Sequence, residues 1–167
     1  MNIVFDLGKV LIEWDPRHLY RKVFSNEADM EWFLANVCHG AWNLEQDRGR
    51  SWEEAMAEAI NRHPAHEHNI RLFRKRWMEM VPGAIPGAVD ILEELHARGA
   101  ALYAITNWAG DTFRETRARF PFLRHFRDIV VSGDEKVIKP DPAIFELLTS
   151  RNGLDPAACL FIDDSLK

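Results

Sequence analysis

The sequence predicts an α/β protein with a parallel sheet, helices on both faces of that sheet, and an inserted segment made only of helices. Two observations lead to this fold class. Short apolar runs alternate with helical patterns in residues 1–13 and 83–167, which is typical of parallel strands joined by helices. Residues 14–82 between them show helical patterns alone. A chain of 167 residues that is 47% hydrophobic can bury one good core and carry a small appended subdomain.

The first element is a short apolar strand. The run Ile3, Val4 and Phe5 suits a strand that is covered on both faces, and turn and apolar residues continue to position 12. Asp6 follows the run directly. Because a buried carboxylate is costly unless another group pairs with it, the position of Asp6 calls for a partner elsewhere in the chain.

The inserted segment is predicted to begin with a helix that has Asp15 as its N-cap and Pro16 at its first position. The run "NEADMEWFLANVC" is apolar at helical spacing, Ser51 and Glu54 form a capping box, and "HNIRLFRKRWMEM" adds another helix. The stretch "HPAHEH" is expected to be a polar loop. The segment is rich in tryptophan, with Trp14, Trp32, Trp42, Trp52 and Trp77.

Tryptophans at this density are more often core than pocket residues, so Trp14, Trp42 and Trp108 are assigned to the core. Trp108 is the strongest candidate for an exception, because it directly follows a polar Thr-Asn pair at a strand end.

After Pro82 the chain alternates between helix and strand. Two of the three expected helices end at glycines, Gly99 and Gly153, and the last helix begins with Asp141 as N-cap followed by Pro142. The elements are, in order, a helix over 85–100, a strand over 101–107, a helix over 110–120, a strand over 128–134, a helix over 139–153 and a strand over 158–164.

Polar residues follow the strands of the predicted sheet. In sheets of this kind, active sites lie at the carboxyl ends of the strands. A nucleophilic carboxylate, a hydroxyl, an ammonium and an acidic pair are the parts needed for phosphoryl transfer through an aspartyl-phosphate. The residues that supply them are Asp6, Thr106, Asn107, Lys139, Asp163 and Asp164.

Each of these residues also has a structural interpretation. An aspartate at a strand end often caps a turn, and Thr106 with Asn107 suits an ordinary strand-to-helix turn. Lys139 alone would be a surface lysine, and "DDS" would favour the start of a helix. The functional interpretation is preferred because all of these groups fall on one edge of one sheet.

At this point the sequence resembles the haloacid dehalogenase superfamily of hydrolases. The matching motifs are "VFDLGKVL", "YAITN", "IKPDPAIF" and "LFIDDS", in family order. The resemblance implies a Rossmann-like core over 1–13 and 83–167 and a helical cap domain over 14–82, which covers the site and shapes substrate choice. It also implies a Mg²⁺-dependent phosphatase that acts on a small phosphorylated metabolite such as a sugar phosphate.

The resemblance implies a role for each matching residue. Asp6 attacks phosphorus and is phosphorylated, and water then hydrolyses the intermediate. Lys139 pairs with Asp6 and with the phosphate. Thr106 and the backbone of Asn107 bind phosphate oxygens. Trp108 is counted with Asn107 as a substrate-binding residue because it directly follows the Thr-Asn pair. The Mg²⁺ ligands are Asp6, the carbonyl of Gly8, Asp164 directly, and Asp163 directly or through water.

The sequence departs from the family pattern at three places. Many family phosphatases carry an aspartate as general acid and base two residues after the nucleophile, where this chain has Gly8. The acid–base step is therefore unassigned, and we expect slow turnover or a preference for esters with good leaving groups, because a missing acid forfeits about 10²–10⁴-fold. Relatives often have Gly or Asn at the position of Lys9, and the sequence leaves open whether this lysine contacts the substrate phosphate or points away from the site. The relatives also continue with a helix, a strand and a helix after the acidic pair, so this chain is expected to be a fragment or to lack those elements.

Two other functions are weighed. A 2-haloacid dehalogenase would attack carbon without a metal, but the family's dehalogenases do not keep the acidic pair that Asp163 and Asp164 form here. A non-catalytic protein that binds a phosphorylated metabolite would have no need of the nucleophile Asp6.

Composition narrows the expected partners. The net charge of −5 argues against nucleic acid, and no apolar run approaches the roughly 20 residues that span a membrane. Without a signal peptide pattern, and with Cys38 and Cys159 in apolar surroundings, the chain is expected to be cytoplasmic with buried, unpaired thiols. The tryptophan-rich segment is compatible with a homodimer.

Overall fold

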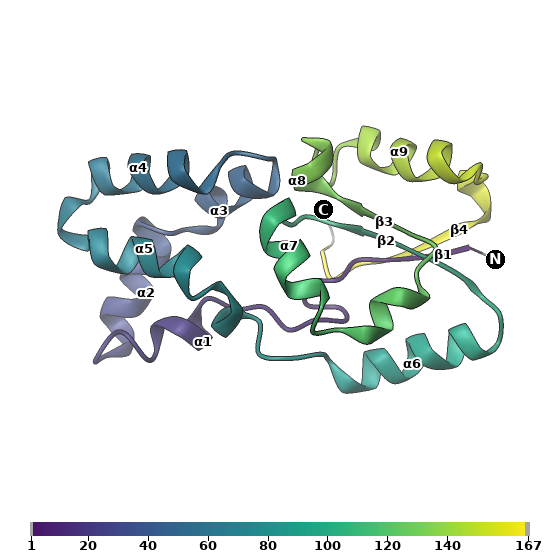
Figure 1. Ribbon diagram of the computed structural model, residues 1–167, viewed down its shortest axis with the longest axis horizontal. Coiled ribbons are helices and arrows are strands. Elements are labelled where there is room, and N and C mark those ends of the chain that lie inside the picture. The colour runs from purple at the N-terminus through teal and green to yellow at the C-terminus, as the bar shows by residue number, and fades with distance from the viewer. Residues whose placement is uncertain (1, 166–167) are drawn as a thin grey trace.

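The computed structural model describes residues 2–165 and places them in two lobes (Figure 1). The sheet lobe contains strands β1 (Asn2–Phe5), β2 (Ala101–Thr106), β3 (Asp128–Val131) and β4 (Cys159–Ile162). Its helices are α6 (Pro86–Ala97), α7 (Gly110–Arg117), α8 (Ser132–Glu135) and α9 (Pro142–Asn152), with the 3₁₀ turns η3 (Pro121–His125) and η4 (Pro156–Ala158). The helical lobe contains α1 (Arg17–Tyr20), α2 (Glu27–Asn36), α3 (Gly40–Asp47), α4 (Trp52–Arg62), α5 (Glu67–Lys75), η1 (Pro64–His66) and η2 (Trp77–Met80).

The four strands form one parallel sheet in the order β3-β2-β1-β4, with β1 paired to both β2 and β4. Ile3 and Phe5 belong to the core on one face, which α6 covers, while Val4 packs on the other face beneath α9. The alternation follows from the two-residue period of a strand. The prediction of a parallel sheet with helices on both faces is confirmed.

The helical lobe packs around aromatic side chains. The ring of Phe73 in α5 lies 5.2 Å from Trp42 and 5.9 Å from Trp52, centroid to centroid. The predicted capping box of Ser51 and Glu54 is present at the start of α4. Trp42 is 6% exposed and its indole N–H donates to a carbonyl, which confirms its assignment to the core.

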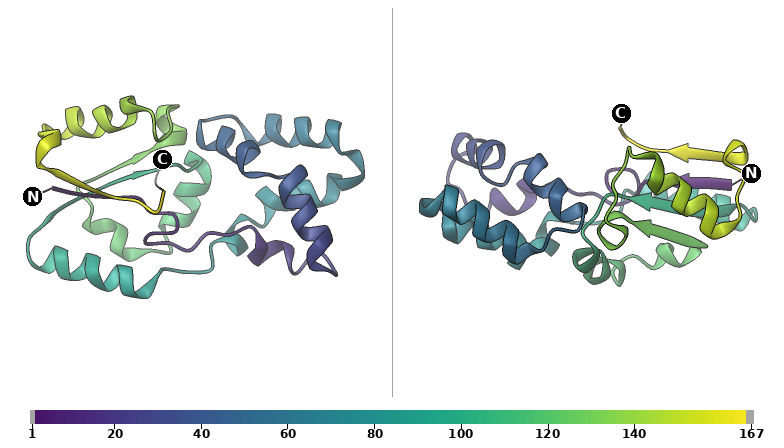
Figure 2. Two further views of the ribbon diagram at one scale, coloured as in Figure 1. Left: turned by 180° about the vertical axis from the view of Figure 1, so that it is seen from behind. Right: turned by 90° about the horizontal axis from the view of Figure 1, so that it is seen from above.

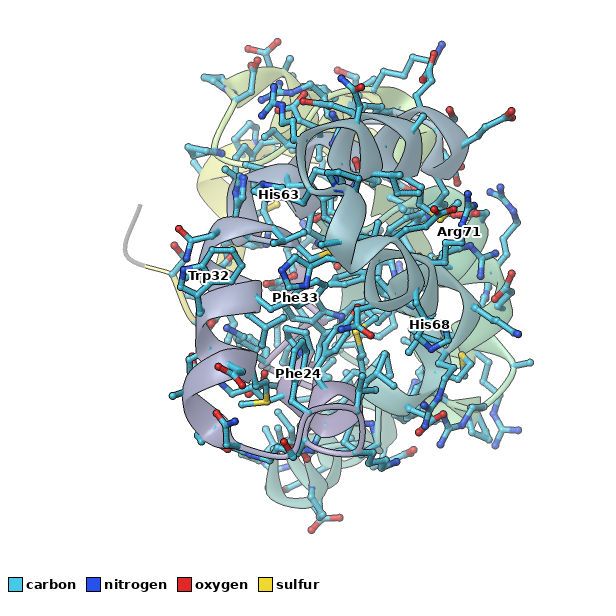
Figure 3. All side chains as sticks on the ribbon, turned by 90° about the vertical axis from the view of Figure 1, so that its left-hand side faces the viewer. Phe24, Trp32, Phe33, His63, His68 and Arg71 are labelled. Carbon is cyan, nitrogen blue, oxygen red and sulfur yellow. The ribbon has the colours of Figure 1, made fainter. Side chains whose placement is uncertain are left out.

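Two local predictions in the helical lobe are corrected, and one helix was missed. "HPAHEH" is not a polar loop but forms η1 and the start of α5. The rings of His63 and His66 pack on Trp32, with centroid distances of 6.4 Å and 5.5 Å. Figure 3 shows His63 and Trp32 on the same face of the helical lobe. The first helix begins at Arg17 instead of Pro16, although Asp15 still accepts a hydrogen bond from the Arg17 amide at 2.9 Å. The helix α3 was not predicted.

The sheet lobe differs from prediction in smaller ways. The third strand ends at Val131, because residues 132–135 turn into α8, and α7 ends at Arg117 where a helix to residue 120 was expected. The edge position of β4 is as expected, and it leaves Leu160 half exposed. Cys38 is a buried free thiol, whereas Cys159, on the edge strand, is only partly buried.

The two lobes are joined by specific polar contacts beside α7 and α8 (Figures 1 and 2). The indole N–H of Trp52 donates to Asp111 at 3.1 Å, and Arg74 forms ion pairs with Asp111 and Glu115. The Ser132 hydroxyl donates to the carbonyl of Asp47 at the end of α3. These contacts hold the helical lobe against the carboxyl ends of the strands.

Within residues 2–165, none of the helices combines the length and the apolar composition that crossing a membrane would require.

Candidate active site

Asp6 lies at the carboxyl end of β1, one of the two inner strands of the sheet. Its amide donates to the carbonyl of Ile162 at 2.8 Å, which continues the pairing of β1 with β4. Its side chain turns back so that Oδ1 accepts a hydrogen bond from the Leu7 amide at 2.7 Å. Asp6 is 8% exposed, and this burial raises its pKa although Lys139 acts to lower it.

Lys139 joins two of the predicted carboxylates. Its Nζ lies 3.0 Å from Oδ1 of Asp6 and 2.6 Å from Oδ2 of Asp163, and the three side chains are only 10–14% exposed. The ammonium also lies 5.3 Å from the centroid of the Phe161 ring. One cation thus balances two buried carboxylates, which answers the question that the position of Asp6 raised.

Asn107 positions Lys139 from the end of β2. Its side-chain oxygen accepts a hydrogen bond from the Lys139 amide at 2.8 Å, and its Nδ2 donates to the Lys139 carbonyl at 3.1 Å. The neighbouring Thr106 is 1% exposed, and its hydroxyl has no partner among the described residues. A buried hydroxyl of this kind is available to a bound oxygen ligand.

The acidic residues gather around Asp6. One carboxylate oxygen from each of Asp6, Asp163 and Asp164 lies within 4.8 Å of the other two. Oδ1 of Asp163, the oxygen that is not bound by Lys139, accepts a hydrogen bond from the Ser165 amide at 2.8 Å. Three carboxylates at this spacing fit a hard divalent cation such as Mg²⁺.

A cavity of about 150 Å³ opens beside Asp6. The cavity wall is formed by residues of the sheet lobe, of the connection that follows β1, and of the helical lobe. A molecule in the cavity would therefore contact both lobes. The lining residues are Asp6, Gly8, Lys9, Trp14, Asn43, Asp47, Trp77, Asn107 and Trp108.

Lys9 lines this cavity and has a φ of 62°, in the left-handed region. Side chains other than Gly and Asn are disfavoured there. The sequence left open whether Lys9 faces the site, and the structure places it on the cavity wall.

Three tryptophans form a row along the cavity. The Trp14 and Trp77 rings lie 6.1 Å apart, and those of Trp77 and Trp108 lie 6.3 Å apart. All three indole N–H groups are buried without a hydrogen-bond partner among the described residues. Trp14 packs against the core as expected, but it is only partly buried and also lines the cavity. Trp108 is buried and also lines the cavity, as expected for the candidate exception to the core assignment.

Sequence reasoning missed two cavity residues on α3, Asn43 and Asp47. Asp47 is 8% exposed. Burial raises its pKa to about 7, hydrogen bonding from the Ala109 backbone opposes this, and the charge of Asp6 adds to it. No local signal could have identified Asp47, because an aspartate at the end of a short polar helix usually faces water.

The chain matches the haloacid dehalogenase-like hydrolases over residues 1–167. It is 30% identical to the phosphoserine phosphatase of Thermus thermophilus over 119 residues, 71% of this chain and 47% of that protein. It is 23% identical to the fructose-1-phosphate phosphatase YqaB of Escherichia coli over 170 residues, 98% of this chain and 86% of that protein. This chain thus spans about half the length of the Thermus enzyme.

Among solved structures, the fold resembles the HAD family enzyme BT-2542 of Bacteroides thetaiotaomicron in its magnesium complex. The TM-score is 0.73 at 21% identity, and the match covers 99% of this chain and 84% of the other. The two proteins share a fold.

Proposed function

Because the chain belongs to the haloacid dehalogenase-like hydrolases, we propose that it is a Mg²⁺-dependent phosphatase that acts on a small phosphorylated metabolite. The observation that carries the proposal is the buried contact of Lys139 with Asp6 and Asp163, at 3.0 Å and 2.6 Å. It sets a carboxylate nucleophile beside a fixed positive charge, which is the combination that attack on a phosphate needs.

In the proposed reaction Asp6 attacks phosphorus. Its Oδ1 accepts a hydrogen bond from the Leu7 amide and pairs with the Lys139 ammonium. We therefore assign the attack on phosphorus to Oδ2. The bond from phosphorus to the ester oxygen breaks and an aspartyl-phosphate forms. Water then attacks phosphorus, the bond to Asp6 breaks, and phosphate leaves. Lys139 balances negative charge throughout.

The phosphate oxygens would be held at the end of β2. The unpartnered Thr106 hydroxyl can donate to one oxygen, and the backbone of Asn107 to another. The Asn107 side chain is engaged with the Lys139 backbone, so it contributes by positioning Lys139.

The carboxylates around Asp6 suit a Mg²⁺ ion. Asp6, Asp164 and the Gly8 carbonyl would hold it, with Asp163 as a direct or water-mediated ligand. When bound, the ion would supply positive charge next to the phosphate oxygens. The acidic cluster supports this assignment, as does the magnesium complex of a protein with the same fold.

The tryptophan row favours a sugar phosphate as substrate. Flat apolar rings with three unpartnered N–H donors suit a ligand that has both apolar surface and several oxygen acceptors. A sugar has both, and one relative is named as a fructose-1-phosphate phosphatase.

Trp14→Phe tests this substrate assignment. The change keeps an aromatic ring and removes the indole N–H, so the KM for the sugar phosphate that is turned over fastest should rise about 3–10-fold, the loss of one hydrogen bond. Trp42→Phe is the matched control, because its N–H already donates to the Ala55 carbonyl in the core. The control should lower the melting temperature without raising KM. Equal KM values for Trp14→Phe and wild type would contradict the assignment.

Two other functions are less well supported. A dehalogenase has no use for the acidic cluster around Asp6. A purely binding protein has no use for a nucleophile with a buried ammonium beside it.

The deciding experiment measures phosphate release from fructose-1-phosphate, phosphoserine and p-nitrophenyl phosphate, with Mg²⁺ and with EDTA, and halide release from chloroacetate. We expect phosphate release with Mg²⁺ only, and no halide. Halide release would support the dehalogenase instead. If neither phosphate nor halide were released, a binding protein would be the better explanation.

A further inference from the structure

We propose that Asp47 is the general acid and base of this enzyme and replaces the carboxyl group that Gly8 lacks. The inference rests on the proposed phosphatase function. Gly8 lines the cavity but has no side chain that could carry a proton. A group that protonates the leaving alcohol must therefore come from elsewhere on the cavity wall, within reach of the ester oxygen.

Asp47 is placed for this role. Among the described residues that line the cavity, Asp6 and Asp47 are the two with carboxyl groups. They approach it from different lobes, with Asp6 at the end of β1 and Asp47 at the end of α3. An ester whose phosphorus lies at Asp6 extends its alcohol into the cavity, toward the lobe that carries Asp47.

The end of α3 is fixed to the loop that forms the phosphate side of the cavity. The Ser132 hydroxyl donates to the Asp47 carbonyl and accepts from the Trp108 amide at 2.9 Å. Ser132 is fully buried. The Asp47 carboxyl group accepts a weak hydrogen bond from Nδ2 of Asn43 at 3.5 Å and another from the Ala109 backbone. Among residues 2–165 it forms no ion pair.

The surroundings of Asp47 let it hold and release a proton near neutral pH. Its pKa of about 7 follows from burial and from the nearby charge of Asp6. Lys9 also faces the cavity. The helix α8 packs against α3 and carries Asp134 and Glu135, and both are already paired with arginines.

Asp47 gives up one proton in the first step of the reaction and takes one back in the second. As Oδ2 of Asp6 bonds to phosphorus, the ester bond breaks and its electron pair stays on the alcohol oxygen, which takes the proton of Asp47. Water then bonds to phosphorus and gives one proton to the Asp47 carboxylate, while the electron pair of the bond to Asp6 returns to Asp6. The enzyme ends as it began, and the products are the alcohol and hydrogen phosphate.

The test compares the sugar phosphate that is turned over fastest with p-nitrophenyl phosphate, whose leaving group departs without a proton. Asp47→Asn should lower kcat/KM for the sugar phosphate by about 10²–10⁴-fold and for the aryl ester by less than about tenfold, because kcat/KM does not include the later water attack that both esters share. Asp47→Glu should restore part of the sugar phosphate rate. Glu45→Gln, which removes a carboxylate from the same helix away from the cavity, should match wild type on both esters.

The pH profile of the wild type provides a second measurement that does not depend on a variant folding. Asp47 must hold its proton in the first step, so kcat/KM for the sugar phosphate should fall as the pH rises through about 7, and kcat/KM for the aryl ester should not. Asp47→Asn should remove this difference between the two profiles.

The outcomes separate this inference from the proposed function. Equal losses of kcat/KM on both esters, no loss on either, or a wild type that hydrolyses the aryl ester alone would overturn the role of Asp47 and leave the phosphatase standing. A wild type that is silent on every ester would overturn the phosphatase and the role of Asp47 together.

Discussion

Replacing Asp6 by asparagine is expected to lower phosphate release by about 10⁴-fold or more, because an amide oxygen cannot form the phosphoryl intermediate. The fold should survive the change. Asparagine has the same shape, its oxygen can still accept from the Leu7 amide, and the buried charge of Asp6 is removed. Phosphate release with Mg²⁺ measures the effect, and circular dichroism checks the fold.

A second readout identifies the intermediate itself. Mass spectrometry of acid-quenched wild type should find one added phosphoryl group on the peptide that contains Asp6, and Asp6→Asn should show none. Asp128→Asn is the matched control. Asp128 is the first residue of β3, so it lies at the amino ends of the strands, opposite to the end that carries Asp6. Its activity should equal that of wild type. If Asp6→Asn retained a tenth of the wild-type rate, another group would have to be the nucleophile.

The residues at the strand ends could be predicted from the sequence for a simple physical reason. Parallel strands all present their carboxyl ends at one edge, so Asp6, Asn107 and Asp163 had to come close once the strands were identified. The position of Lys139 was harder to predict, because it precedes a helix and does not end a strand. Its long side chain reaches the site while two hydrogen bonds with the Asn107 side chain hold its backbone. The contact distances come from the structure alone.

The helical side of the cavity could not be predicted in this way. Which face of α3 meets the sheet lobe depends on how the lobes dock, and contacts such as Ser132 with Asp47 join residues 85 positions apart. Trp14 shows the same limit. Its sequence surroundings suit a core residue, and only the position of the neighbouring lobe turns its indole into part of a cavity wall.

Lys139→Met should weaken both the fold and the activity, because the side chain keeps its length and loses its charge. Asp6 and Asp163 would then face each other without the ammonium that lies 3.0 Å and 2.6 Å from them. Removing one partner of a buried ion pair costs about 3–5 kcal/mol. We expect a loss of this size in the free energy of unfolding, measured by urea titration at neutral pH with EDTA present.

The activity of Lys139→Met should fall by about 10²–10³-fold, since a fixed positive charge next to the reacting phosphate is lost. Lys22→Met is the matched control. Its ammonium also lies 2.8 Å from a carboxylate, that of Glu79, but its side chain is 57% exposed, and such surface pairs contribute about 1 kcal/mol or less. If both variants lost equally little stability, the contacts of Lys139 would be no stronger than those of a surface lysine. The charge balance that we assign to Asp6 and Asp163 would then have to come from another group.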